Sequence, residues 1–502
     1  MVDMLNLRPG GPCPRYRGVF GLWLAVAAVP AAAQLSPLTS QTFFYQQAGA
    51  PQSGDYLAAN GGAIFTSNAA RSTSGSNDTL LMLGLSGSDR REGTRLDYHL
   101  SSDLALVKYL SSTFPTRPTG FLDAFGSFKF VPGFFSWIAR ESFSQVQINP
   151  YVPVTPENLV SINNITTGPR FTMRPTLRTS VRLDLLYSYL TTSSASSQYT
   201  NFDNHRYGGD LRIDRAFSEA ASLYLKGHYE KAEFKDTADN HDYRLAEAQL
   251  GYKLVDGRTV FDVSGGYSQI HIYDVPAQVE SIGGTREVLE TQSFSDPVWR
   301  VDISRLVTPT QRVALYASQQ FTDAASVFRL GFDQSVPLIA PPAQATAEVF
   351  KQNSVGVSWR LQGPRTSLNI GLGQYRQRYL LQSAYSLNTD FKSANAMLTR
   401  QLSPALKWDL GGQYQKQDQI GTQPEGVAPS SLRLWGALTD LHWQVGEHLS
   451  LRFIYSHTSQ SGVYADNQIG VTASWTLVAA QATAPGLPVL TPIAPASTRA
   501  RP

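Results

Sequence analysis

Histidine can serve both as a catalytic acid or base and as a metal ligand. The eight histidines are scattered along the chain: His99, His205, His228, His241, His271, His442, His448 and His457. None has the spacing of a known metal-binding motif such as His-Glu-x-x-His. His228 lies between Lys226 and Glu230 on one face of an alternating segment, where a polar lining is the commoner role. We therefore expect no catalytic residue, no metal and no cofactor, and an enzyme remains only a minor alternative.

The charged residues are more informative, because they alternate with apolar ones. Around residue 184, Arg182 and Asp184 fall on one face of an extended segment, and Leu183, Leu185 and Tyr187 fall on the other. Applied along the chain, this rule predicts one set of residues that line an interior: Arg178, Arg182, Asp184, Arg212, Asp214, Lys226, Glu230, Glu247, Lys253, Arg300, Asp302, Arg312, Arg360, Lys407, Asp409 and Arg452. Cations outnumber anions here, which favours anions in a channel. Alternatively, neighbours such as Arg182 and Asp184 neutralise one another.

The elements that position these residues are long strands. A period of two dominates from residue 60 to residue 477, and single segments run for more than ten residues. Strands of soluble sheets average about five or six residues, whereas a strand that crosses a membrane needs about 9–11. Alternating strands give a weak hydropathy signal, consistent with a mean hydropathy of -0.21.

The connections between the strands alternate between short and long. Tight turns rich in Gly, Pro, Asp and Ser are expected near residues 89–92, 131–133, 174–175, 217–219, 256–257, 308–310, 362–364, 403–404 and 446–447. Longer polar loops are expected at 149–159, 192–204, 274–297, 323–349, 380–389 and 419–430. Short turns at one end and long loops at the other are typical of outer-membrane barrels.

These observations predict an all-β protein, a single antiparallel up-and-down transmembrane β-barrel of about 18–20 strands. An open sheet edge cannot be tolerated in hydrocarbon, so the sheet must close. The last strand carries Ile469, Val471, Ala473 and Trp475 on one face, and it is similar to the C-terminal strand that barrel-assembly machinery recognises. That machinery, outer-membrane lipid and lipopolysaccharide are the expected partners.

The segments outside the barrel have distinct compositions. Residues 1–33 combine arginines, an apolar run and Ala31-Ala32-Ala33, which predicts a cleaved signal peptide and export through the periplasm to the bacterial outer membrane. Residues 34–59 are expected to be a periplasmic segment, and the Pro- and Ala-rich residues 478–502 a disordered tail. Cys13, the single cysteine, lies in the leader. The net charge of +3 and the lack of a basic stripe exclude nucleic-acid binding.

One stretch carries a resemblance to a known family. Phe121-Leu122-Asp123-Ala124, a turn, the run from Phe134 to Phe143, the Asn- and Pro-rich loop from Gln147 to Asn164 and Gly168-Pro169-Arg170 resemble the outer-membrane β-barrels associated with the exosortase (PEP-CTERM) system. The resemblance continues as a pattern to about Trp475. It implies a surface role connected with exopolysaccharide, with polysaccharide-export components as partners, and it supplies no catalytic residue.

Two functions follow as expectations. The first is a porin-like passive channel, linked to exopolysaccharide export or surface assembly. The second is a structural or binding barrel without transport activity, plugged by its own loops. For the plug, the stretch from Asp323 to Val349, with Pro337, Pro341 and Pro342, is long enough to fold inward.

Overall fold

The computed structural model describes residues 56–149, 151–194, 201–236, 240–281, 284–323, 346–381, 387–421 and 430–479. For residues 277–281, 284–288 and 478–479 it describes the backbone alone. All of these residues belong to one compact unit. Within these ranges, no helix has both the length and the apolar character needed to cross a membrane.

The described chain is almost entirely β-strand, apart from one 3-10 turn at Pro156–Asn158. The strands are β1 Tyr56–Thr66, β2 Asp78–Glu92, β3 Leu96–Tyr109, β4 Arg117–Val131, β5 Phe135–Gln147, β6 Leu159–Thr176, β7 Thr179–Ser194, β8 Asn204–Ala216, β9 Ala221–Phe234 and β10 Tyr243–Asp256. They continue with β11 Thr259–Ser281, β12 Gly284–Thr308, β13 Gln311–Thr322, β14 Phe350–Gln362, β15 Thr366–Tyr379, β16 Thr389–Ser403, β17 Leu406–Gln419, β18 Ser431–Gln444, β19 Leu449–Gln460 and β20 Tyr464–Ala479.

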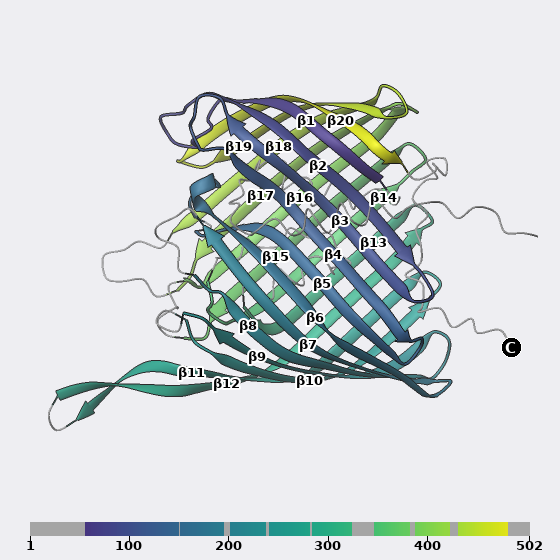
Figure 1. The fold of residues 1–502 in the computed structure, drawn as a ribbon, viewed down its shortest axis with the longest axis vertical. Helices are drawn as coiled ribbons and strands as arrows, with labels where there is room; N and C mark the ends of the chain where they lie inside the picture. Colours follow the sequence, from purple (N-terminus) through teal and green to yellow (C-terminus); the bar gives the residue numbers. More distant parts are fainter. Residues whose placement is uncertain are drawn as a thin grey trace, which may run out of the picture. The chain divides into compact units, whose positions relative to one another are not determined.

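These strands form one closed barrel (Figure 1). Each strand pairs antiparallel with its neighbours in sequence, and the 20-stranded sheet closes where β1 pairs with β20. At this seam the Thr66 hydroxyl donates to Asp466 Oδ1 over 2.7 Å. The predicted fold class and strand number are confirmed.

The exposure pattern is the reverse of that in a soluble protein. Leu83, Leu250 and Leu372 are 68%, 60% and 55% exposed, respectively. On β7, Asp184 and Ser188 lie on the face opposite the apolar side chains, and both are almost fully buried. Apolar side chains on the outer surface and polar ones inside are the arrangement of a barrel whose outer wall faces hydrocarbon.

The two ends of the barrel differ in their connections. At one end, here called the turn end, each pair β2–β3, β4–β5 and so on to β18–β19 is joined by a short turn. The sequence predicts these nine turns, but two of them lie later than predicted. Residues 89–92 and 174–175 belong to β2 and β6, and the chain reverses at 93–95 and 177–178 instead. The opposite end, here called the loop end, carries the longer connections. The first and last strands, β1 and β20, begin and end at the turn end.

The segment from Asp274 to Pro297 differs from the sequence prediction of a loop. Here β11 and β12 continue as a paired hairpin that extends past the rest of the rim (Figure 1). A register shift between Ile272 and Val275 marks the point of departure. Pro276 and Pro297 suggest a loop in the sequence, but both lie beyond the ladders of the adjacent strands β10 and β13. Proline is tolerated in such edge positions because a neighbour on that side needs no hydrogen bond.

The last strand places its predicted signal residues on the outer surface. Ile469, Val471 and Trp475 are 59%, 45% and 52% exposed, and Ala473 shares their face. Their strand pairs on one side with β19 and on the other with β1. Recognition of this strand by assembly machinery stays a prediction.

Candidate functional site

The charged residues that alternation assigned to the interior lie on the strand faces opposite the exposed apolar ones. Arg212 and Asp214 flank the outward Ile213, and Arg300 and Asp302 flank the outward Val301. Arg178 is the exception, because it lies exposed in the turn between β6 and β7. The candidate site is therefore the lumen, and its two sides differ in chemistry.

The wall formed by β4 to β12, here called the charged wall, is built from ion pairs. Arg170 donates two hydrogen bonds of 2.8 Å to Asp184, and Arg182 lies 3.6 Å from the same carboxylate. Arg212–Asp214 and Arg300–Asp302 are same-strand pairs two residues apart, at 2.8 Å and 2.5 Å. Lys407–Asp409, on β17, forms a pair of the same kind at 3.1 Å. These contacts favour the alternative in which neighbouring charges neutralise one another.

The most buried of these contacts lies near the loop end, and it joins Glu230, which alternation assigned to the interior, to three residues that it did not assign. Arg206 on β8 donates to Glu230 over 2.9 Å and to the Tyr243 hydroxyl over 3.0 Å, and it also pairs with Asp323. The side chains of Arg206 and Asp323 are 4% and 2% exposed. We call these four residues the Arg206 knot. Alternation along β8 places Arg206 on the same face as Arg212, but no sequence signal connects it to Asp323, which is 117 residues away.

An apolar cluster surrounds the Arg206 knot and includes its Tyr243. Ile162 on β6, Leu190 on β7 and Ile270 on β11 are among its members, each at most 2% exposed. Val349, next to β14, also belongs to it. The loop end is therefore packed on this side. The predicted plug, Asp323 to Val349, lies mostly outside the described residues, which include its ends, 323 and 346–349.

The described connection that crosses the mouth is the one between β5 and β6. Arg117, at the start of β4, donates to Pro156 O over 2.9 Å, and Arg71 donates to Val154 O over 3.2 Å. Gln460 on β19 donates to Tyr151 O over 3.2 Å. Asn158 fastens the connection internally by donating to the carbonyl oxygens of Asn149, Val152 and Pro153.

Tyr151 is the residue of this connection that lies near the opposite wall of the barrel. Its side chain lies near Gln417 on β17, nine strands around the ring from β6, but the Tyr151 hydroxyl has no hydrogen-bond partner. Burial raises the pKa of Tyr151, so the phenol stays neutral at any physiological pH. The β5–β6 connection thus extends from β6 toward the opposite wall of the barrel.

The wall that Tyr151 meets is uncharged toward the loop end. We call its inward residues the amide wall: Gln352, Tyr375, Gln377, Phe391, Gln415 and Gln417. Among the described residues, the inward charges of β14–β18 are Arg360, Lys407, Asp409 and Asp440, all in the half nearer the turn end. Register places Gln352 opposite Gln377, and Tyr375 opposite Phe391, which in turn faces Gln417.

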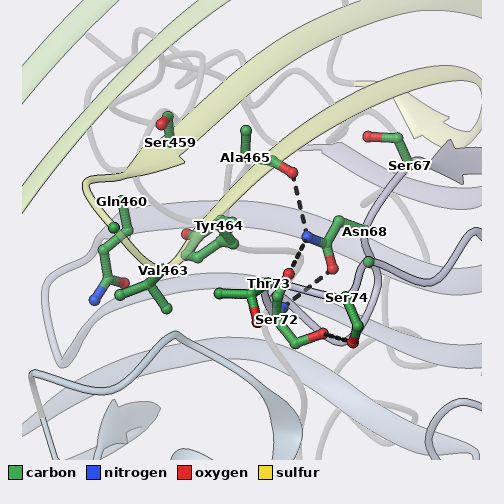
Figure 2. A pocket seen from close by; sticks show the side chains of 12 residues that line it. Ser67, Asn68, Ser72, Thr73, Ser74, Ser459, Gln460, Val463, Tyr464 and Ala465 are labelled. Carbon is green, nitrogen blue, oxygen red and sulfur yellow. Dashed lines mark hydrogen bonds between the residues drawn. The ribbon is translucent and has the colours of Figure 1, made fainter.

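A pocket of about 450 Å³ opens at the loop end beside the seam (Figure 2). Its lining is hydroxyl- and amide-rich, and includes Ser67, Asn68, Ser72, Ser459 and Gln460. Asn68 Nδ2 donates to Ser72 O and to Ala465 O, so this amide is already engaged. Gln460 belongs both to this pocket and to the contact with Tyr151.

Comparison with known proteins found similar solved structures but no related sequence. No protein-family model matches the chain, and no curated protein sequence matches it. Among solved structures, the FrpB iron transporter from Neisseria meningitidis (F5-1 variant) is similar, with a TM-score of 0.47 at 10% identity over 87% of this chain and 84% of that one. The ferric-catecholate import receptor Fiu from E. coli, in its closed form, has a TM-score of 0.45 at 9% identity over 85% and 82%. OccK2 from Pseudomonas aeruginosa has a TM-score of 0.35 at 11% identity over 85% and 98%. The solutes of these proteins carry no argument for this chain at such scores.

The histidines offer no reactive group within the described ranges. His228 bonds to Asp210 over 2.9 Å on the charged wall, and His99 lies 4.0 Å from Asp123. His205 stacks on Tyr189, and His457 lies tilted against Trp435, both at the outer surface. In the described part of the chain, no three His, Cys, Asp or Glu side chains are grouped to hold a metal ion.

Proposed function

We propose that this protein is an outer-membrane barrel that forms a porin-like passage for polar solutes. One observation carries the proposal: the exposed outer face is apolar, whereas the inner face holds the ion pairs and amides. A barrel of this many strands encloses a lumen wider than side chains alone fill. Lipid and lipopolysaccharide would contact the outer face, and barrel-assembly machinery would insert the chain after export through the periplasm.

The solute proposed for this passage is exopolysaccharide or a fragment of it. The resemblance of residues 121–189 to exosortase-associated barrels supports this choice, as does the uncharged amide wall. Polysaccharide-export components of the periplasm would then be the functional partners. Transport would be passive, because nothing in the described lumen supplies a reaction.

A second candidate function is a plugged barrel that binds a ligand or acts as a surface scaffold. The β5–β6 connection favours it, since Tyr151 and the backbone oxygens near it bridge the two sides of the mouth. The Arg206 knot and its apolar cluster narrow the same end.

Single-channel recording separates the two candidates. The full chain, produced in a bacterial host and purified from its membranes, is added to a planar bilayer in potassium chloride. Discrete conductance steps are expected for a passage. A protein that is folded, as judged by heat-modifiable migration in gels, yet gives no steps would contradict the passage and support the plugged barrel.

A further inference from the structure

The amide wall contains buried polar atoms without partners. Gln352 Oε1, Tyr375 OH, Gln377 Nε2, Gln415 Nε2 and Gln417 Oε1 lack a hydrogen bond, although these residues are only 2–5% exposed. Buried polar groups in folded proteins are nearly always paired, and an unpaired one costs free energy. Five such atoms on β14, β15 and β17 therefore point to a ligand or ordered water that completes them.

The chemistry of these five atoms defines the ligand. The two amide oxygens, Gln352 Oε1 and Gln417 Oε1, accept hydrogen bonds, the two amide nitrogens donate them, and a phenol does both. A ligand must then offer donors and acceptors close together, as a hydroxyl group does. Charged ligands are disfavoured, because binding an ion in a buried site requires a counter-charge and this half of the wall has none among its described residues.

Aromatic rings lie among these polar atoms. The rings of Tyr375 and Phe391 are tilted by 54° with centroids 6.1 Å apart, and those of Phe350 and Tyr379 are tilted by 50° with centroids 5.2 Å apart at the rim of the same wall. Alternating ring faces and amides suit a sugar, whose pyranose ring has an apolar C–H face and an edge of hydroxyls. Aromatic side chains with a few placed polar groups are the usual composition of small-molecule sites.

We infer that the amide wall is a binding site for a neutral oligosaccharide, covered in this structure by the β5–β6 connection. The Tyr151 side chain lies near Gln417 and Tyr379, so a sugar bound to the loop-end part of the wall would have to displace it. The Tyr151 hydroxyl is itself buried without a hydrogen-bond partner, so the wall does not hold it in place. The inference deepens the proposed function by naming a neutral sugar as the solute and the wall that holds it.

The pocket beside the seam lies close to the amide wall. Gln460 lines this pocket, and register places it opposite Leu434, which faces Gln415. Two strand spacings, about 10 Å, therefore separate the pocket residue from the amide wall. Uncharged hydrogen-bonding groups are present in both places.

Titration calorimetry with the detergent-solubilised full chain tests the inference without requiring conductance. The probe is maltohexaose, and hexagalacturonate is the charged control of equal length. Maltohexaose is expected to bind, and the charged sugar at least tenfold more weakly. Tyr151→Ala should bind maltohexaose more tightly, because the competing side chain is gone.

Variants of the wall locate the site. Gln377→Leu and Gln415→Leu should each weaken maltohexaose binding about five- to tenfold, the usual effect of one lost hydrogen bond. Tyr375→Phe removes one hydroxyl while keeping the ring, so it gives the same answer if a leucine variant fails to fold. Gln362→Leu, on the same face of β14 at the turn end, should leave binding unchanged.

Several results would overturn the inference. Equal affinity for hexagalacturonate and maltohexaose would contradict a neutral-sugar site. Unchanged maltohexaose affinity in all three variants, Gln377→Leu, Gln415→Leu and Tyr375→Phe, would contradict the location of the site. No heat of binding with either the wild type or Tyr151→Ala, or tighter binding of a neutral Gly-Ser hexapeptide, would contradict sugar binding itself. Conductance without maltohexaose binding would leave the passage standing and remove the sugar site, whereas binding without conductance would do the reverse.

Discussion

The charged wall and the amide wall both alternate inward polar residues with outward apolar ones, but their inward polar groups are paired differently. In the first, Arg170, Arg206 and Arg212 are each paired with a carboxylate of the same or a neighbouring element. In the second, polar atoms of Gln352, Gln377 and Gln415 are buried without partners. The charged wall also has unpaired buried atoms, Asn164 Oδ1 and Asp302 Oδ1, but its cations are held by carboxylates of the protein, which makes it structural. In the loop-end half of the amide wall the described inward residues form no ion pair, so its polar groups are available to a ligand.

The largest difference between the walls should appear on breaking the Arg206 knot. Arg206→Met leaves Glu230 and Asp323 as uncompensated buried carboxylates, a change that typically costs about 3–5 kcal/mol. The free energy of unfolding, measured by urea titration in detergent, should fall by this amount. Arg90→Met is the control, because the Arg90–Glu92 pair is about 70% exposed and such pairs contribute little. A loss no larger than that of the control would contradict a structural role for the charged wall.

Glutamine-to-leucine changes should have opposite signs on the two walls. In Gln415→Leu an unpartnered buried amide is replaced by an apolar group of similar size, so the sugar-free protein should gain about 1 kcal/mol. In Gln249→Leu, on the charged-wall side, a glutamine is lost that donates to Glu247 over 2.6 Å and accepts from Ser264 over 2.7 Å. That variant should lose about 1 kcal/mol. Equal losses in both variants would remove the distinction between the walls.

Acidic pH should act at the rim between them. Burial raises the pKa of Glu348 to about 7 from its ordinary 4.5, and this residue lies beside Tyr379 above the amide wall. The folded protein therefore prefers the protonated carboxyl, so stability should fall as pH rises from about 4.5 to 7 and level off above. Glu348→Gln should lose this component, as seen in the difference between the two melting temperatures across pH 4 to 8. Parallel melting curves for both proteins would contradict it.

An effect on ion selectivity is expected from Asp184→Asn. The change keeps the shape of the side chain but leaves Arg170 and Arg182 without their shared carboxylate. The lumen gains positive charge, so the reversal potential in a potassium chloride gradient should shift toward that of chloride. An unchanged potential would place the charged wall outside the conduction path.

The sequence predicts much of this molecule, because alternation and turn chemistry are local. Strand number, the turns, and the inward face of Arg212 and Asp214 follow from residues close to one another in the chain. The Arg206–Asp323 contact and the reach of Tyr151 to Gln417 depend on how the loops fold over the mouth, which no local pattern encodes. The amide wall had a signal that went unused: Gln413, Gln415, Gln417 and Gln419 occupy every second position of β17.

The seam between β1 and β20 affects the kinetics of barrel folding. Every other strand pair joins neighbours in sequence, so most of the sheet can form hairpin by hairpin at a low cost in loop entropy. Thr66 and Asp466 are 400 residues apart, and their contact waits until the last strand exists. Until then both sheet edges carry unpaired backbone groups, which hydrocarbon penalises heavily. The rate at which β20 pairs with β1 therefore determines how long the incomplete barrel needs its two sheet edges protected from hydrocarbon.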